Sequence, residues 1–124
     1  MSMYSLYIVD DEDTIRRTLT IALEGRYLLA DFPDAESAVA AARVGPPDLV
    51  LLDLGLPGMS GIEAIPVFRA IAPEILIVVI TAYEDVTSVV SALKGGAYAY
   101  VVKPLDIHAR EMSMANAPRS LRLK

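Results

Sequence analysis

Short, nearly continuous apolar runs alternate with amphipathic stripes along the chain, and this alternation is what most constrains its fold. The runs cover residues 5–10, 27–32, 48–53, 75–81 and 98–102. Nearly continuous apolar strands are typical of a parallel sheet covered on both faces. Strands that alternate with helices therefore predict an α/β fold, a doubly wound five-stranded parallel sheet with helices on both faces.

Helices between these runs are indicated by apolar residues at three- and four-residue spacing. The four stripes are Ile15, Leu19, Ala22 and Leu23; Ala35, Ala38, Val39 and Ala42; Ile62, Ile65 and Phe68 or Ile71; and Val86, Val89, Val90 and Leu93. We expect Asp34 to cap the second helix and Ser60 with Glu63 to form a capping box for the third. Pro66 predicts that this third helix starts late or kinks. A fifth helix is expected from Asp106.

With 124 residues, the chain is long enough for one domain and too short for two. We expect this domain at residues 1–117, followed by a basic tail or the start of a linker at residues 118–124. A net charge of −5 argues against direct nucleic acid binding by the domain. The sequence has no apolar run near the roughly 18 residues of a membrane helix and no signal-peptide pattern at its start. A cytoplasmic protein without membrane contact is therefore expected.

Polar residues stand where four of the apolar runs end. Asp10 and Asp11 close the first run, Asp53 closes the third, Thr81 closes the fourth and Lys103 follows the fifth. Because the carboxyl ends of parallel strands meet at one edge of the sheet, we expect these side chains to lie together. A hydroxyl, an ammonium group and three carboxylates at one edge are suited to handling a phosphoryl group.

The carboxylates also predict a cation. Three carboxylates held together stay ionised only if a cation joins them. Carboxylate oxygens favour Mg²⁺, whereas a chain with no cysteine and one histidine makes a zinc centre improbable. Asp53 is the candidate nucleophile because it stands alone at its strand end, and the adjacent Asp10 and Asp11 are better suited to holding metal. We interpret Glu12 and Asp13 as an acidic helix start favoured by the helix dipole.

Together these residues resemble the receiver domain of two-component response regulators, over residues 4–117. The motifs that carry the resemblance are Ile8-Val9-Asp10-Asp11-Glu12, Leu51-Leu52-Asp53 with Leu56-Pro57-Gly58-Met59-Ser60-Gly61 after it, Ile80-Thr81-Ala82, and Gly96-Ala97-Tyr98-Ala99-Tyr100-Val101-Val102-Lys103-Pro104. Any one of these motifs is weak, but all four occur in order on predicted strand ends. The resemblance implies the flavodoxin-like strand order 2-1-3-4-5.

The resemblance also implies a site chemistry. A sensor histidine kinase or a phosphotransfer protein would donate a phosphoryl group to Asp53. Mg²⁺ would be held by Asp10, Asp11, Asp53 and the backbone carbonyl of Gly55. Lys103 would pair with the phosphoryl oxygens.

A switch is implied as well, in which Thr81 swings toward the phosphoryl group and Tyr100 turns inward into the space it leaves. The surface of the fourth helix, fifth strand and fifth helix would change between two packings, and would control an output domain or form a homodimer. The chain would then be a phosphorylation-dependent regulator, not a turnover enzyme.

Other interpretations stay open at this point. An aspartyl-phosphate phosphatase or phosphotransferase would want a second Asp two positions after the nucleophile, where this chain has Gly55. A flavodoxin-type cofactor binder would want a phosphate-cradling first loop, which the acidic residues 10–13 would oppose. A degenerate receiver that only mediates contacts would not need all the site residues. In receivers, the side chains two positions after the phosphorylated Asp and two after the Thr border the path of water to the phosphoryl group. The resemblance implies that Gly55 and Tyr83 take these places, and we expect slow loss of a phosphoryl group from Asp53.

Overall fold

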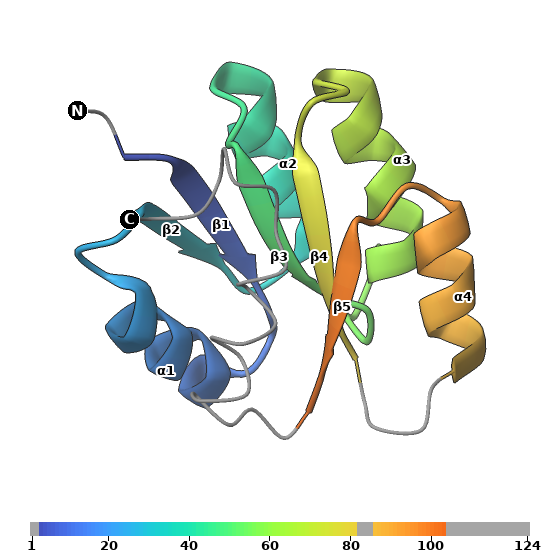
Figure 1. The fold of residues 1–124 in the computed structure, drawn as a ribbon, viewed down its shortest axis with the longest axis horizontal. Helices are drawn as coiled ribbons and strands as arrows, with labels where there is room; N and C mark the ends of the chain where they lie inside the picture. Colours follow the sequence, from blue (N-terminus) through green and yellow to red (C-terminus); the bar gives the residue numbers. More distant parts are fainter. Residues whose placement is uncertain (1–2, 82–85, 104–124) are drawn as a thin grey trace.

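One five-stranded parallel sheet forms the centre of the molecule (Figure 1). The computed structural model describes residues 3–81 and 86–103. The strands are β1 Ser5–Val9, β2 Leu28–Phe32, β3 Leu49–Asp53, β4 Leu76–Thr81 and β5 Ala99–Val102. Their order is β2-β1-β3-β4-β5, and every pairing is parallel. The predicted fold class and strand order are confirmed.

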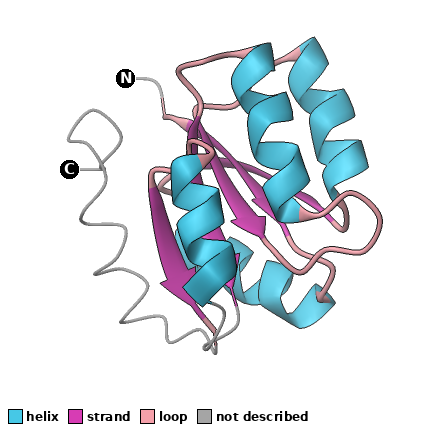
Figure 2. Ribbon diagram, turned by 90° about the vertical axis from the view of Figure 1, so that its right-hand side faces the viewer, coloured by secondary structure: helices cyan, strands magenta, loops and turns pink. Residues whose placement is uncertain are grey.

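Helices alternate with the strands and pack against the sheet (Figure 2). They are α1 Asp13–Leu23, α2 Ala35–Val44, α3 Gly61–Ile71 and α4 Val86–Lys94. The predicted fifth helix, the tail at residues 118–124 and Tyr83 lie outside the described residues.

Two buried clusters, one on each face of the sheet, make up the core. Alternate residues of a strand point to opposite faces, so Val50 and Leu52 of β3 join one cluster, and Leu49 and Leu51 join the other. The first cluster includes residues of α2, α3 and α4, and the second includes Leu19 and Leu23 of α1. Doubly wound packing therefore follows from strands that are apolar on both faces.

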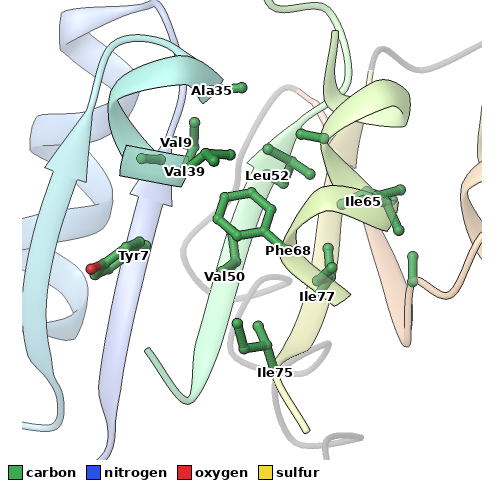
Figure 3. Close-up of a cluster of buried hydrophobic side chains, with 14 of the residues drawn as sticks. Tyr7, Val9, Ala35, Val39, Val50, Leu52, Ile65, Phe68, Ile75 and Ile77 are labelled. Atoms are coloured by element: carbon green, nitrogen blue, oxygen red, sulfur yellow. The ribbon is translucent and has the colours of Figure 1, made fainter. Parts of the chain in front are cut away.

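Phe68 of α3 is at the centre of the larger cluster. Its fully buried ring lies among Val39 of α2 and Val50 and Leu52 of β3 (Figure 3). Truncating a buried Phe to Ala typically costs about 3–5 kcal/mol. This helix and strand flank the loop that follows Asp53, so the core fixes both ends of that loop.

Local capping agrees with the sequence. The Asp34 carboxylate accepts a hydrogen bond from the Ser37 N–H at 2.7 Å. Ser60 and Glu63 form the predicted reciprocal capping box at the start of α3. The helix therefore begins at Gly61, so that of the two alternatives expected for Pro66, a late start or a kink, the late start is wrong. Pro66 is accommodated on the exposed side of the helix, inside its bounds.

The apolar stripe of α4 is not a buried face. A stripe at helical spacing normally faces the core, yet Val86, Val90 and Leu93 are exposed. The buried residue of α4 is Ala92, which joins the cluster that contains Ile65 of α3. The helix packs near the sheet edge through a small residue, and most of its larger apolar side chains stay outside. Among the described residues, no helix is long and apolar enough to cross a membrane.

Candidate functional site

Three strands of the sheet deliver buried polar groups to one edge. Asp10 follows β1, Asp53 ends β3 and Thr81 ends β4, and they are respectively 0%, 4% and 2% exposed. They are the buried polar or charged residues of the part that the structure describes. Strand register brings them together, since Val9 pairs with Leu52 and Asp53 pairs with Ile80. Buried polar groups are costly without partners, so this edge is a site and not part of the core.

Lys103 completes the group from the end of β5. Its backbone N–H donates to the Thr81 carbonyl at 2.8 Å, which fixes the start of its side chain. Its ammonium nitrogen lies 2.9 Å from Glu12 Oε1, 3.3 Å from Asp10 Oδ2 and 3.4 Å from Asp53 Oδ2. Burial favours the neutral amine, but the hydrogen bond to Glu12 and the charges of Asp53 and Asp10 outweigh it and raise the pKa of Lys103. The lysine is therefore a permanent cation.

The Asp53 carboxylate is held by both of its oxygens. Oδ1 accepts a hydrogen bond from the Gly55 N–H at 3.0 Å, and Oδ2 faces Lys103. Burial raises the pKa of Asp53, while the Gly55 N–H and Lys103 oppose that rise and the charge of Asp11 adds to it. The strand end thus presents an oriented carboxylate whose negative charge is only partly compensated.

The Asp10 carboxylate accepts a hydrogen bond through only one of its two oxygens. Its Oδ1 accepts the Glu12 N–H at 2.9 Å, but its buried Oδ2 has no hydrogen-bond partner, although Lys103 lies within ion-pair distance. Burial raises the pKa of Asp10, and the charge of Asp53 adds to this. A buried carboxylate oxygen without a hydrogen bond is expected where a cation binds.

A cation fits this corner of the site. Carboxylate oxygens of Asp10, Asp11 and Glu12 lie within 4.8 Å of one another. All-oxygen donors suit a hard divalent ion such as Mg²⁺. Asp10 and Asp11 were predicted for this role and are brought together, whereas Glu12 was interpreted only as part of an acidic helix start. Gly55, whose carbonyl was also predicted as a ligand, is an exposed residue two positions after Asp53, between the buried Leu54 and Leu56.

Arg16 of α1 holds the loop that carries the carboxylates of Asp10, Asp11 and Glu12, and the sequence analysis did not identify this residue. Its Nη1 donates to the Asp10 carbonyl at 2.6 Å, its Nε donates to Asp31 of β2 at 2.9 Å, and Asp13 also pairs with it. The guanidinium is mostly buried and ties the loop after β1 to the neighbouring strand. The three-residue spacing of Asp13 and Arg16 on a predicted helix is the one signal that pointed to it.

The loop after Asp53 is fixed by Glu36 of α2. The Met59 N–H donates to Glu36 Oε2 at 2.9 Å. Gly58 has a φ of +70°, and a Cβ added there would lie 2.6 Å from the same oxygen. Glycine at this position allows both the left-handed turn and the close approach of the carboxylate.

The two predicted switch residues lie on adjacent strands but differ in exposure. Thr81 is buried at the end of β4. Tyr100 of β5 pairs in register with Val79 and is 47% exposed. The Tyr100 side chain is therefore not packed into the core.

A family model for the response regulator receiver domain matches residues 6–112. This match covers most of the chain and all four strand ends that form the site. The chain belongs to this family. It is the receiver domain of a two-component response regulator.

Curated relatives support the assignment. The DNA-binding response regulator MtrA of Mycolicibacterium smegmatis is 44% identical over 100 residues, which cover 80% of the receiver and 43% of MtrA. The regulatory protein AtoC of Escherichia coli is 35% identical over 113 residues, which cover 82% of the receiver and 22% of AtoC. The receiver thus spans less than half the length of these relatives.

Solved structures share the fold. The chemotaxis protein CheY4 of Vibrio cholerae has a TM-score of 0.86 at 22% identity, and the match covers 94% of the receiver and 100% of that chain. NtrX of Brucella abortus has a TM-score of 0.85 at 28% identity, and the match covers 97% of the receiver and 27% of the NtrX chain. The strand order of the receiver is thus that of a CheY-like sheet.

Proposed function

We propose that Asp53 accepts a phosphoryl group from the phosphohistidine of a sensor histidine kinase or a phosphotransfer protein. The observation that carries this proposal is the position of Asp53, a buried carboxylate at a strand end with Lys103 Nζ 3.4 Å from Oδ2. A phosphoryl transfer to a carboxylate needs an oriented nucleophile and neutralisation of the phosphoryl oxygens. The Gly55 N–H orients Asp53, and Lys103 supplies a positive charge.

In this reaction an oxygen of Asp53 attacks phosphorus in line with the bond to the imidazole nitrogen. The P–N bond breaks, its electron pair stays on the imidazole, and an aspartyl phosphate forms on Asp53. Lys103 then pairs with a phosphoryl oxygen, and the Thr81 hydroxyl donates to another. No general base is required, because the Asp53 carboxylate attacks in its ionised form.

Mg²⁺ belongs to the same proposal, held by Asp10, Asp11, Asp53 and the carbonyl of Gly55. The bound ion would supply charge neutralisation at the oxygens of the transferring group. The buried Oδ2 of Asp10, which accepts no hydrogen bond and has Lys103 at 3.3 Å, and the carboxylate cluster around it support this assignment. Lys103, which follows β5, lies 3.3 Å from Asp10 Oδ2 and 3.4 Å from Asp53 Oδ2, so it borders both the proposed metal ligands and the proposed acceptor.

The output would be a change in the surface formed by α4, β5 and the predicted fifth helix. We propose that Thr81 moves toward the phosphoryl group and that Tyr100 turns inward. Exposed apolar side chains of α4, of β5 and of the residue just before β5 support a contact there with an output domain or a second copy; they are Val86, Val90, Leu93, Tyr100 and Tyr98. We do not assign direct nucleic acid binding to the receiver itself, whose net charge is −5.

The rival enzyme function, an aspartyl-phosphate phosphatase or phosphotransferase, is less well supported. That chemistry needs an acid/base carboxylate beside the nucleophile. The residue two positions after Asp53 is Gly55, which offers a backbone N–H and no side chain. A regulator that modifies only itself is therefore the function we propose.

The test is phosphorylation by acetyl phosphate in the presence of Mg²⁺, followed by intact-mass spectrometry. We expect the wild type to gain one phosphoryl group and Asp53→Asn to gain none. Asp48→Asn is the matched control, because Asp48 precedes the same strand at its opposite end and should leave incorporation unchanged. Phosphate incorporation that persists in Asp53→Asn would place the acceptor elsewhere.

A further inference from the structure

Glu12 makes the shortest side-chain contact of Lys103. Its Oε1 is 2.9 Å from the ammonium nitrogen, compared with 3.4 Å for Asp53 Oδ2. The two residues are 91 positions apart, so the contact joins the loop after β1 to the end of β5. Lys103 is thus shared among Asp53, Asp10 at 3.3 Å and Glu12. Glu12 borders the carboxylates of Asp10 and Asp11 but is not one of the residues proposed to hold Mg²⁺ or to accept the phosphoryl group.

Helix capping does not account for this carboxylate. Glu12 occupies the N-cap position of α1 but makes no side-chain capping hydrogen bond. Asp34 and Ser60, in the same position of α2 and α3, both cap their helices through the side chain. The side chain of Glu12 is directed to Lys103 instead, and it remains 56% exposed.

We propose that Glu12 is a positioning residue that competes with Asp53 for Lys103 and thereby limits how tightly Asp53 takes up a phosphoryl group. The proposal rests on the proposed role of Asp53. Lys103 carries one positive charge, and its attraction to Glu12 must be weakened as it shifts toward oxygens attached to Asp53. Because Glu12 is half exposed, solvent screens the pair, and the effect is expected to be modest.

The experiment is a calorimetric titration with beryllofluoride, a phosphoryl mimic, at Mg²⁺ concentrations that saturate each variant. We expect Glu12→Gln to bind beryllofluoride about two- to five-fold more tightly than the wild type, the range that exposed ion pairs typically provide. At saturating Mg²⁺, a weaker metal affinity caused by the lost charge does not affect the measured affinity for beryllofluoride. Asp13→Asn is the matched control, because it removes the same charge from the next residue, which pairs with Arg16 and not with Lys103.

A double-mutant cycle separates competition for Lys103 from a general charge effect. In a Lys103→Met background, Glu12→Gln should no longer tighten beryllofluoride binding. A second measurement needs no bound phosphoryl mimic: in metal-free protein, the ammonium protons of Lys103 followed by NMR should exchange faster with water in Glu12→Gln than in Asp13→Asn.

Each outcome decides the proposal. Equal affinity of wild type and Glu12→Gln, or equal tightening by Asp13→Asn, would overturn it. Tightening that persists in the Lys103→Met background would also overturn it, because Glu12 would then act without Lys103. A wild type that binds no beryllofluoride would refute the proposed function itself, which keeps the two failures apart.

Discussion

Asp48 and Asp53 stand at opposite ends of β3, and their surroundings differ sharply. At the amino end, Asp48 Oδ2 accepts the Ser5 N–H at 2.8 Å, and the Asp48 N–H donates to Ser5 Oγ at 3.1 Å. At the carboxyl end, Asp53 is buried beside a second carboxylate, Asp10, and shares one lysine with it. The Asp48 side chain helps to join two strands, whereas Asp53 keeps negative charge that the protein only partly neutralises.

The same residue type thus serves stability at one edge of the sheet and binding at the other. Reciprocal hydrogen bonds to backbone groups stabilise a fold by about 1 kcal/mol each. Buried like charges destabilise it until a cation arrives. The contrast predicts opposite responses to substitution at the two edges.

The largest effect is expected for Asp10→Asn at the carboxyl edge. This change should lower Mg²⁺ affinity by about 10- to 100-fold, the typical loss when a supporting group of a metal site is removed. It should also raise the free energy of unfolding in EDTA by about 1 kcal/mol, because a buried charge with incomplete hydrogen bonding is gone. Calorimetric Mg²⁺ titration and urea denaturation measure the two effects.

The pH dependence of that stability gain checks its cause. The pKa of Asp10 is raised in the folded state above its ordinary value of 3.8, so the folded protein binds more protons than the unfolded chain in the window above that value. The stability associated with the neutral carboxyl is present below 3.8 and is lost as pH rises through the raised pKa. The advantage of Asp10→Asn should therefore grow with pH through this window. An advantage independent of pH would contradict the electrostatic explanation.

A change of stability with the opposite sign, smaller than the loss of Mg²⁺ affinity in Asp10→Asn, is expected at the amino edge. Asp48→Ala should lower the free energy of unfolding by about 1–2 kcal/mol, because the Ser5 N–H loses its acceptor. It should leave Mg²⁺ affinity unchanged. Asp48→Asn keeps an acceptor oxygen and should lose less than the alanine variant. If Asp48→Ala proves as stable as the wild type, the hydrogen bonds between Ser5 and Asp48 do not contribute to the pairing of β1 with β3.

Most of the fold and several of the proposed site residues could be predicted because they depend on patterns of neighbouring residues in the sequence, namely apolar runs and the polar residues that follow them. Four of the five apolar runs end in or just before a polar residue, and parallel strands bring those ends to one edge of the sheet. Asp10, Asp53, Thr81 and Lys103 therefore meet as predicted.

The parts that could not be predicted depend on where long side chains reach. The spacing of Glu12 fits an acidic helix start, and only the position of Lys103 reveals its contact. Arg16 likewise acts through Asp10 and Asp31, which belong to other elements. The exposed stripe of α4 shows the same limit, because periodicity indicates an apolar face but not whether a neighbour covers it.

The smallest expected effect concerns Gly55, which we expect to border the path of water to the phosphoryl group proposed for Asp53. An added Cβ at Gly55 would lie 3.7 Å from Asp53 Oδ1, an ordinary contact, and Gly55 does not have a positive φ. An asparagine side chain therefore fits there and can hold a water near the phosphoryl group. General acid–base catalysis with a fully aligned group contributes typically 10²–10⁴-fold, but an amide that only orients water should speed loss of the phosphoryl group roughly a few-fold.

The decay of phosphorylated protein with Mg²⁺, followed by intact-mass spectrometry, measures this rate. Gly45→Asn is the control from the amino edge, where an added Cβ meets no atom within 4 Å and lies at the opposite end of the strands from Asp53. Faster decay in Gly55→Asn alone would place control of the lifetime at the carboxyl edge. Equal decay in the wild type and both variants would mean that access of water beside Gly55 does not set the lifetime, and the predicted slow loss would need another cause.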